Sequence, residues 1–218
     1  MPLEILPIKT SILTKKDNIS EVINNYAGNV ITSDDLVAVA ESVVAITQGM
    51  FAFADQIHVT PWARLLCRFI PDYGSLATPH GMQTLFNAEG TFRVSAALFA
   101  GFLGKVIGKP GLFYSLGGYQ AALIDDISGT MPPFDKCVVL GPATPNQVVA
   151  DICNATKPFG AIIADVNDLH RARIVAHSDN VKPEVAANAL LDNPFGNASQ
   201  KQPICILKNF RQYQEERS

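Results

Sequence analysis

The fold is decided by the stretch Gly160-Ala161-Ile162-Ile163-Ala164, which is followed at once by Asp165-Val166-Asn167-Asp168. The unbroken apolar run predicts a buried strand, and the polar residues after it predict a turn. A second apolar run, Leu36-Val37-Ala38-Val39-Ala40, follows the turn residues Ser33-Asp34-Asp35. Two buried strands of this kind indicate a chain in which strands and helices share a core.

Further strands and helices are predicted on either side of these two runs. Short apolar runs predict strands at residues 3–8, 136–140, 173–176 and 204–207, and residues 43–47 are expected to continue the strand at 36–40. Apolar residues at helical spacing predict helices at 19–26, 145–155 and 183–191. The polar residues from Arg211 onward are expected to be frayed.

Three Thr-Pro steps predict where helices begin. In Thr60-Pro61, Thr78-Pro79 and Thr144-Pro145, a capping hydroxyl precedes a proline, whose missing N–H is harmless in the first helical turn. Gln147 stands three residues after Thr144, which is the spacing of a capping box. The first two steps lie in a largely helical middle segment at about residues 60–108.

The composition is rich in apolar residues and poor in charge. Of the 218 residues, 48% are hydrophobic and 17% are charged, and the net charge is −3. This composition excludes an intrinsically disordered chain, and its charge provides no overall attraction for nucleic acid or acidic membranes. The surplus of apolar residues indicates either an extensive core or a hydrophobic surface that a partner covers.

The cysteines and the N-terminus indicate the reducing cytoplasm. The four cysteines are far apart and have apolar neighbours, so buried free thiols are expected. The N-terminus lacks the basic start and the long apolar run of a signal peptide. The apolar run at residues 94–107 is shorter than the ~20 residues that span a bilayer, so a core or interface helix is expected. A helix lying on a membrane surface would require this segment to be exposed.

Polar side chains after the strand at 160–164 are the first candidates for chemistry. Ligands of open α/β sheets gather beyond the carboxyl ends of strands, where Asp165, Asn167 and Asp168 stand. Carboxylate and amide oxygens suit Mg²⁺ or Mn²⁺. Ordinary turn chemistry is the alternative, because Asp and Asn both favour turns.

A second set of candidates follows the apolar run at residues 121–124. Asp125 and Asp126 repel each other, and a bound cation would relieve that repulsion. Ser128 and Gly129 offer a hydroxyl and backbone N–H groups to a phosphate. A helix cap or a solvated loop is the alternative.

His80 is a weaker candidate, because it stands near a predicted helix N-terminus, where it could help to bind an anion. A structural histidine is the alternative. The other histidines have no zinc-ligand spacing. The chain contains no Walker A motif, no G-x-S-x-G and no G-x-G-x-x-G, which leaves simple hydrolase and Rossmann-type functions without support.

Several stretches, taken in order, match one family in combination. They are residues 35–49, residues 123–128 with 138–142, residues 162–168, and the tail from 187–191 to 203–207. Together they resemble the ligases that attach γ-linked glutamate to the deazaflavin coenzyme called factor 420. The resemblance covers about two-thirds of the chain.

The resemblance implies a fold and an activity. The implied fold is α+β with a mixed or antiparallel sheet, here one domain over residues 1–218 with a helical insertion at about 60–118. The implied enzyme is a homodimer that uses GTP and Mg²⁺ or Mn²⁺ to activate a carboxylate as an acyl phosphate, which an amine then attacks. On this resemblance Asp125 and Asp165 are the metal ligands. Taken together with the residues singled out above, the candidates for the nucleotide and its phosphates are Ser128, Asn167 and Arg171, with Asp126, Asp168 and His80 as further candidates.

The chain departs from the family pattern at several positions. Ile46, Gln48 and Met50 stand where the family has a lysine, a glutamate and an arginine, and Val166 replaces a threonine. Arg171 or Arg173 is the displaced substitute for the arginine of the last motif. Each lost cation removes a charge-assisted contact to a nucleotide, worth roughly 1.5–3 kcal/mol.

Two functions therefore stay open. The first is a divergent ligase-like enzyme that forms an amide bond on a small carboxylate with a nucleotide (GTP or ATP) and a metal. The second is a non-catalytic binding or assembly protein that uses the apolar segment around residues 78–116 as an interface. The expected partners are a small-molecule substrate and a second copy of the chain, and neither nucleic acid nor a membrane.

Overall fold

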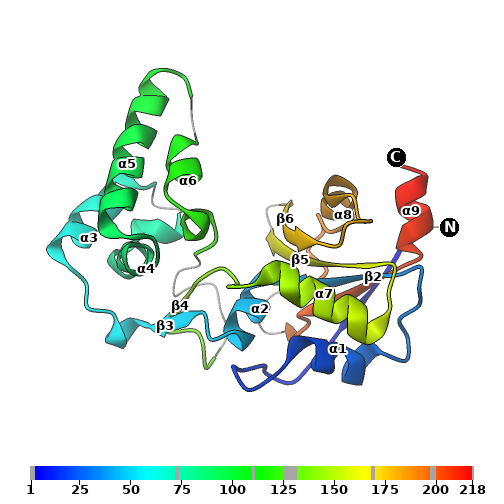
Figure 1. Ribbon diagram of the computed structural model, residues 1–218. Coiled ribbons are helices and arrows are strands. Elements are labelled where there is room, and N and C mark those ends of the chain that lie inside the picture. The colour runs from blue at the N-terminus through cyan, green and yellow to red at the C-terminus, as the bar shows by residue number, and fades with distance from the viewer. Residues whose placement is uncertain are drawn as a thin grey trace. The chain divides into compact units, whose positions relative to one another are not determined.

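The chain folds into two compact units (Figure 1). The computed structural model describes residues 3–71, 74–109, 111–124, 132–167, 170–196 and 200–217. The first unit consists of Met1–Gly49 together with Pro142–Ser218, and the second consists of Met50–Gly141. The second unit is therefore an insertion between two parts of the first.

The first unit is built on a five-stranded mixed sheet with the strand order β1-β7-β2-β5-β6. Only β2 and β5 are parallel, and the other neighbouring pairs are antiparallel. The strands are β1 (Glu4–Ile8), β2 (Leu36–Ala40), β5 (Gly160–Asn167), β6 (Arg171–His177) and β7 (Ile204–Lys208). The expected α+β class with a mixed sheet is confirmed.

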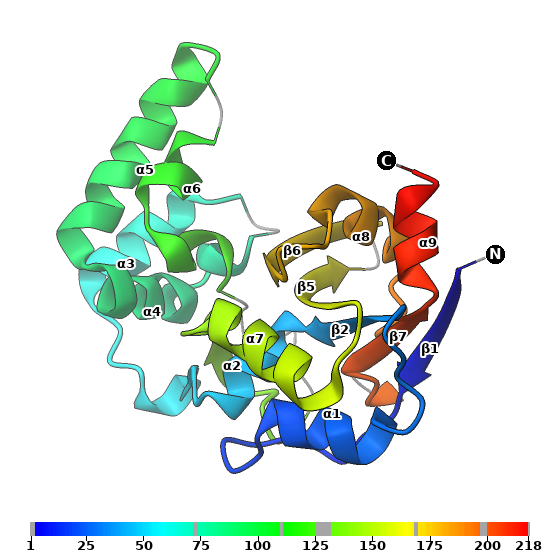
Figure 2. The same ribbon diagram turned by 45° about the vertical axis from the view of Figure 1, so that its right-hand side comes forward.

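Helices cover both faces of this sheet (Figure 2). Because side chains alternate along a strand, Val37 and Val39 pack with α1 and α7, whereas Leu36 and Ala38 pack with α8 and α9 on the opposite face. These helices are α1 (Ile19–Ala27), α7 (Pro145–Thr156), α8 (Pro183–Ala189) and α9 (Phe210–Glu215). Burial on both faces explains the continuous apolar runs of β2 and β5.

Two expectations about this unit are wrong. Residues 43–47 do not continue β2 but belong to α2 (Glu41–Thr47), which begins directly after it. A short apolar run fits a buried strand and a buried helix equally well, so its hydrophobicity did not distinguish the two. Residues 211–215 are not frayed, because they belong to α9, which Phe210 anchors in the core.

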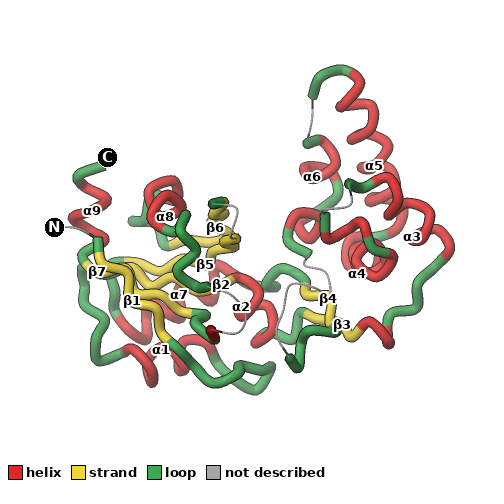
Figure 3. Tube along the Cα trace, turned by 180° about the vertical axis from the view of Figure 1, so that it is seen from behind, coloured by secondary structure: helices red, strands yellow, loops and turns green. Residues whose placement is uncertain are grey.

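The second unit is mainly helical, and a two-stranded sheet joins its ends (Figure 3). The strands β3 (Phe51–Phe53) and β4 (Cys137–Val139) pair antiparallel. The α-helices between them are α3 (Pro61–Leu66), α4 (Pro79–Glu89), α5 (Thr91–Val106) and α6 (Leu112–Leu116). Short 3₁₀ helices occupy Ala54–Gln56, Cys67–Phe69, Ser75–Ala77 and Tyr119–Ala122. This arrangement confirms the predicted helical middle segment.

Two of the three Thr-Pro steps cap helices in this unit as predicted. The Thr60 hydroxyl accepts a hydrogen bond from the Ala63 N–H at 3.3 Å. The Thr78 hydroxyl accepts one from the Gly81 N–H at 3.1 Å. Among the described ranges, no helix combines the length and the hydrophobicity needed to cross a bilayer.

The second unit has its own core. Met82, Leu85 and Phe86 of α4 pack with Val94 of α5 and Phe113 of α6. The cysteines are free thiols in both units. Three are buried as expected and one is half-buried, namely Cys67, Cys137, Cys205 and, half-buried, Cys153.

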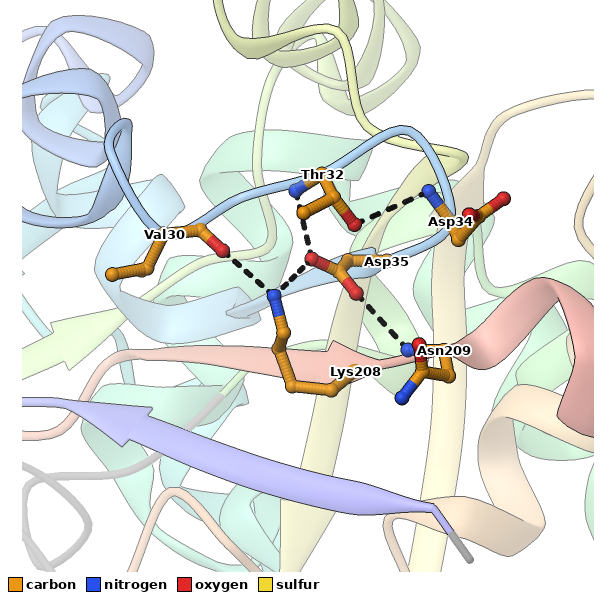
Figure 4. A network of polar contacts seen from close by, with 6 residues as sticks. All are labelled: Val30, Thr32, Asp34, Asp35, Lys208 and Asn209. Atoms are coloured by element: carbon orange, nitrogen blue, oxygen red, sulfur yellow. Dashed lines mark hydrogen bonds and ion pairs between the residues drawn. The ribbon is translucent and has the colours of Figure 1, made fainter. Parts of the chain in front are cut away.

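A buried carboxylate connects the start of β2 to the end of β7 (Figure 4). Asp35 accepts hydrogen bonds from the Lys208 ammonium and, at 2.8 Å, from the Thr32 N–H. It accepts another from the Asn209 N–H at 3.0 Å, and Lys208 also donates to the Val30 carbonyl at 2.7 Å. Burial would raise the pKa of Asp35, but these donors outweigh it and hold the pKa below its usual value.

Candidate functional site

The candidate site lies where the two parallel strands of the first unit end. Ala40 of β2 pairs with Ala164 of β5, so the next residues, Glu41 and Asp165, emerge at the same carboxyl edge. Ligands of open α/β sheets gather at such edges. The candidate site at this edge therefore includes Glu41 as well as Asp165.

The polar motif that includes Asp165 lies inside β5 and not after it. The predicted end of the strand at Ala164 is wrong, because the strand continues to Asn167 and pairs with β6 over its polar end. The pairing with β6 holds these polar residues in an extended conformation. A register shift, the mark of a β-bulge, falls between Ile163 and Ala164. Bulges of this kind are common beside binding sites.

Four polar side chains gather on one face of the β5–β6 ribbon. Asp165 lies opposite Arg173, and Asn167 lies opposite Arg171. Cross-strand partners and residues two apart share a face, so these four residues form one cluster, the β5–β6 quartet. All four are exposed. The quartet continues the face on which Ile163 packs in the core.

The quartet combines one carboxylate, one amide and two guanidinium groups. Desolvation raises the pKa of Asp165, and the positive charge of Arg173 opposes that rise. A carboxylate whose pKa is raised accepts a proton more readily than an ordinary aspartate does. Guanidinium groups form two-pronged hydrogen bonds to phosphates and carboxylates. The cluster can therefore bind an anion beside a proton acceptor.

Glu41 is the residue at this edge that sequence reasoning missed. It is 4% exposed and opens α2 directly after β2. A buried acidic residue in the interior of an α/β unit is unusual. The sequence could have indicated Glu41 as a site residue, because it interrupts the apolar run from Leu36 to Ile46.

Gln48, which replaces a glutamate of the family pattern, holds the start of α7. Its Oε1 accepts a hydrogen bond from the Ala143 N–H at 2.7 Å, and its Nε2 donates to the Thr144 hydroxyl at 2.9 Å. The predicted capping box is wrong, because the Thr144 side chain makes no capping hydrogen bond and Gln147 donates to Asp151 instead. The glutamine at position 48 therefore has a structural role.

Most of the remaining predicted residues fall outside the part of the chain that the structure describes. Asp125, Asp126, Ser128 and Asp168 lie outside the described residues. The convergence of Asp125 with Asp165 therefore stays a prediction. His80 lies in the first turn of α4, in the second unit.

The implied metal fits the described residues poorly. Within residues 3–71, 74–109, 111–124, 132–167, 170–196 and 200–217, no three His, Cys, Asp or Glu side chains are grouped so that they could hold a metal ion. Asp165 also lies opposite Arg173, whose charge repels a cation. The quartet by itself is therefore better suited to an anion than to Mg²⁺ or Mn²⁺.

No protein-family model matches the chain, and a search of curated proteins finds no match.

Proposed function

We propose that the first unit carries the active site of a divergent γ-glutamyl-ligase-like enzyme. The observation that carries this proposal is the β5–β6 quartet at the carboxyl edge of β2 and β5. Arg171 and Arg173 provide two cations at this edge, in a chain that has Ile46 and Met50 where the family pattern has cations. They are the residues proposed to bind the phosphates of GTP or ATP.

The proposed reaction forms an amide bond in two steps. An oxygen of a small carboxylate attacks the γ-phosphorus of the nucleotide, and the bond to the β-phosphate oxygen breaks to release the nucleoside diphosphate. An amine nitrogen then attacks the acyl carbon, inorganic phosphate leaves, and the amine loses a proton. Asp165, whose pKa is raised, is the proposed acceptor of that proton. Mg²⁺ or Mn²⁺ would require ligands beyond the quartet.

A thermal-shift experiment tests this proposal. A nucleotide at about a hundred times its Kd stabilises the native state by about 2.7 kcal/mol, which corresponds to a rise in Tm of roughly 5–10 °C for a chain of this size. GTP and ATP are each titrated with and without Mg²⁺ or Mn²⁺. We expect Arg171→Ala and Arg173→Ala to reduce the shift, and Asp165→Ala to change it.

The control is Asp179→Ala, which removes an exposed carboxylate elsewhere in the same unit. It is expected to retain the full shift. The absence of any shift at millimolar nucleotide would contradict the proposal, and so would a shift that is equal in the wild type and in all three quartet variants.

A second function is favoured by a separate observation. Large apolar side chains of α3 and α5 in the second unit are exposed to solvent. This exposure supports a non-catalytic binding or assembly protein that uses its middle segment as an interface. A chain that binds a partner through this segment and shows no nucleotide-dependent shift would favour the second function.

A further inference from the structure

The helix α5 buries one side and exposes an apolar opposite side. Val94, Ala97 and Gly101 face the core of the second unit. Phe92 and Phe99 occupy the outer side of the helix and are 87% and 66% exposed. Soluble helices normally present polar side chains on the outer side. The outer side of α5 is therefore unusually apolar for a helix that faces solvent.

The exposed apolar surface extends from α5 to α3. The indole N–H of Trp62 on α3 donates to the Ser95 hydroxyl on α5 at 3.0 Å, so the two helices are in contact here. Figures 1 and 3 show α5 between α3 and α6. We define the α3–α5 face by large exposed side chains of these two helices, namely Trp62, Leu65, Phe92, Phe99, Phe102, Leu103 and Val106.

The α3–α5 face is large for an uncovered surface. An aromatic side chain carries roughly 150–250 Å² of area, so the exposed parts of Phe92, Phe99 and Phe102 alone amount to on the order of 400 Å². The largest apolar patch of an ordinary monomer is about 300–600 Å² for all of its residues together. Patches of this size mark interaction sites.

The charged side chains near this face are almost all basic. Exposed cations occur on α3, on the 3₁₀ turn after it, on α5 and beyond its end, at Arg64, Arg68, Arg93, Lys105 and Lys109. Among the described residues from 57 to 124 there is one acidic residue, Glu89. The other acidic residue of this segment, Asp72, lies outside the described ranges. The chain as a whole has a net charge of −3. Positive charge is thus concentrated in the segment of the chain that carries the apolar face.

Glu89 does not offset this charge at the surface. Its side chain is 11% exposed, and one carboxylate oxygen accepts from the Arg93 guanidinium at 3.0 Å. The other oxygen accepts from the Gln120 N–H at 2.8 Å. The four other cations therefore have no exposed carboxylate beside them among the described residues of this segment.

The C-terminal end of α5 has both exposed apolar side chains and exposed cations. Val106 and Ile107 are 71% and 66% exposed and stand between Lys105 and Lys109. Within the second unit this end lies farthest from β3 and β4 (Figures 1 and 2). Lysine side chains can extend their ammonium groups toward lipid phosphates while neighbouring apolar groups enter the bilayer.

We propose that the α3–α5 face docks on the surface of an anionic lipid bilayer. Aromatic side chains would enter the headgroup region and the flanking cations would pair with anionic headgroups, which is how basic amphipathic helices bind membranes. A second copy of the chain fits less well, because it would bring a second basic surface against the first. A helix that lies on a membrane surface must expose its apolar side, and α5 does so. The proposal deepens the second candidate function and does not depend on the ligase proposal.

The chain carries its own reporter for the test. Trp62 lies on the α3–α5 face and is the single tryptophan of the protein. The full chain is titrated with phosphatidylcholine vesicles, with and without phosphatidylserine, while tryptophan emission is recorded. We expect a blue shift of the emission with phosphatidylserine vesicles and little change with phosphatidylcholine alone. Added salt is expected to weaken binding, because it screens the attraction to the anionic surface.

Two double variants separate the contribution of the cations to membrane binding from that of the aromatic side chains. Lys105→Gln combined with Lys109→Gln is expected to weaken binding to phosphatidylserine vesicles by about 25-fold, at about fivefold for each lysine. Phe99→Ser combined with Phe102→Ser is expected to weaken it by at least about tenfold, because buried apolar contacts are lost. The matched control is Lys15→Gln with Lys16→Gln, two exposed lysines of the first unit, and it is expected to bind as the wild type does.

Three results would overturn the proposal. One is the absence of any vesicle-dependent change in Trp62 emission. Another is binding that neither variant pair weakens. The third is a blue shift that grows with protein concentration in the absence of vesicles, together with a doubled mass in sedimentation, which would assign the face to a second copy. None of these results alters the nucleotide-dependent Tm shift, so the ligase proposal is judged separately.

Discussion

At the scale of single residues, two aspartates of the first unit show how their surroundings set their chemistry. Asp35 is buried among donors, and its pKa is lowered, chiefly by Lys208 against the opposing effect of burial. Asp165 is desolvated at the end of the sheet, and its pKa is raised. The first arrangement stabilises a charge for structural purposes, whereas the second favours proton transfer.

Asp35→Asn is expected to destabilise the protein by about 2–4 kcal/mol. The substitution leaves the Lys208 ammonium without its buried counter-charge. Urea unfolding at pH 7 measures the change. The control is Asp34→Asn, whose exposed ion pair with Arg211 at 3.4 Å should be worth less than about 1 kcal/mol. Equal effects of the two substitutions would contradict a special role of the buried pair.

The contribution of Asp35 should also depend on pH in one direction. Its native-state pKa lies below the unfolded value of about 3.9, so the stabilisation is fully present above that value and is lost as the pH falls through the native pKa. The difference in unfolding free energy between the wild type and Asp35→Asn is therefore expected to shrink below about pH 4. A difference that is constant from pH 7 to pH 3 would be inconsistent with this linkage.

Two glycines with left-handed backbones should respond differently to substitution. Gly118 has a φ of +102° and a Cβ there would overlap the Glu89 carboxylate, whereas Gly108 has a φ of +74° and open space around it. We expect Gly108→Ala to cost about 1 kcal/mol for the backbone alone, and Gly118→Ala to cost about 2–4 kcal/mol because it also disturbs the hydrogen bonds of Glu89. Tm values of the two variants measure the difference, and similar values would argue against this role of Glu89.

At the scale of elements, burial on two faces explains which parts of the fold could be predicted from the sequence. Residues 36–40 read as a buried strand and are one, because both faces of β2 are covered by helices. The helix α2 could not be distinguished from a strand, since a short apolar run is ambiguous. The predicted strand ended too early, at Ala164, because the pairing of its polar end with β6 is a tertiary contact that the apolar pattern does not show.

The candidate site was predictable only in part for the same reason. Asp165 and Asn167 were visible as polar residues at the end of an apolar run. Their pairing with Arg173 and Arg171 depends on the register of a hairpin, and a slip of one residue would have placed the arginines on the other face. Glu41 lies at the same edge as Asp165 because β2 and β5 pair in parallel, and this pairing joins residues that are far apart in the chain.

The helix α9 depends on one buried side chain. Phe210 is fully buried and contacts the rings of Phe159 and Tyr213. We expect Phe210→Ala to destabilise the protein by about 3–5 kcal/mol and to release α9. The matched control is Phe92→Ala, at an 87% exposed phenylalanine, with an expected change within about 0.5 kcal/mol. Denaturant unfolding measures both, and a small effect of Phe210→Ala would show that α9 is held by other contacts.

At the scale of the whole molecule, the second unit begins and ends at neighbouring points of the first. Gln48 bonds directly to Ala143, so the two ends of the first unit are adjacent. In the second unit, β3 pairs with β4, so its own two ends are adjacent as well. Insertions of this form are tolerated because neither core depends on the continuity of the chain.

Removal of the second unit should therefore leave a folded first unit. We expect a chain in which a short Gly-Ser linker replaces Met50–Gly141 to unfold cooperatively in urea, with a far-UV circular dichroism spectrum that keeps the strand and helix signal of the first unit and loses the helical signal of the second. A deletion of the same length that begins at Leu36 removes β2 and is expected not to fold. Loss of cooperative unfolding in the first deletion would show that the two units depend on each other for stability.

The position of the insertion also sets the order in which the protein can fold during synthesis. β2 lies between β5 and β7, and β1 pairs only with β7, yet the whole second unit is translated before any of these partners. At translation rates of 5–20 residues per second, β2 waits on the order of 10–30 s for its last neighbour. The second unit, whose ends meet in β3 and β4, can close first. During that interval the strands β1 and β2 are unpaired apolar segments on the ribosome, and they are the part of the nascent chain that most needs a chaperone.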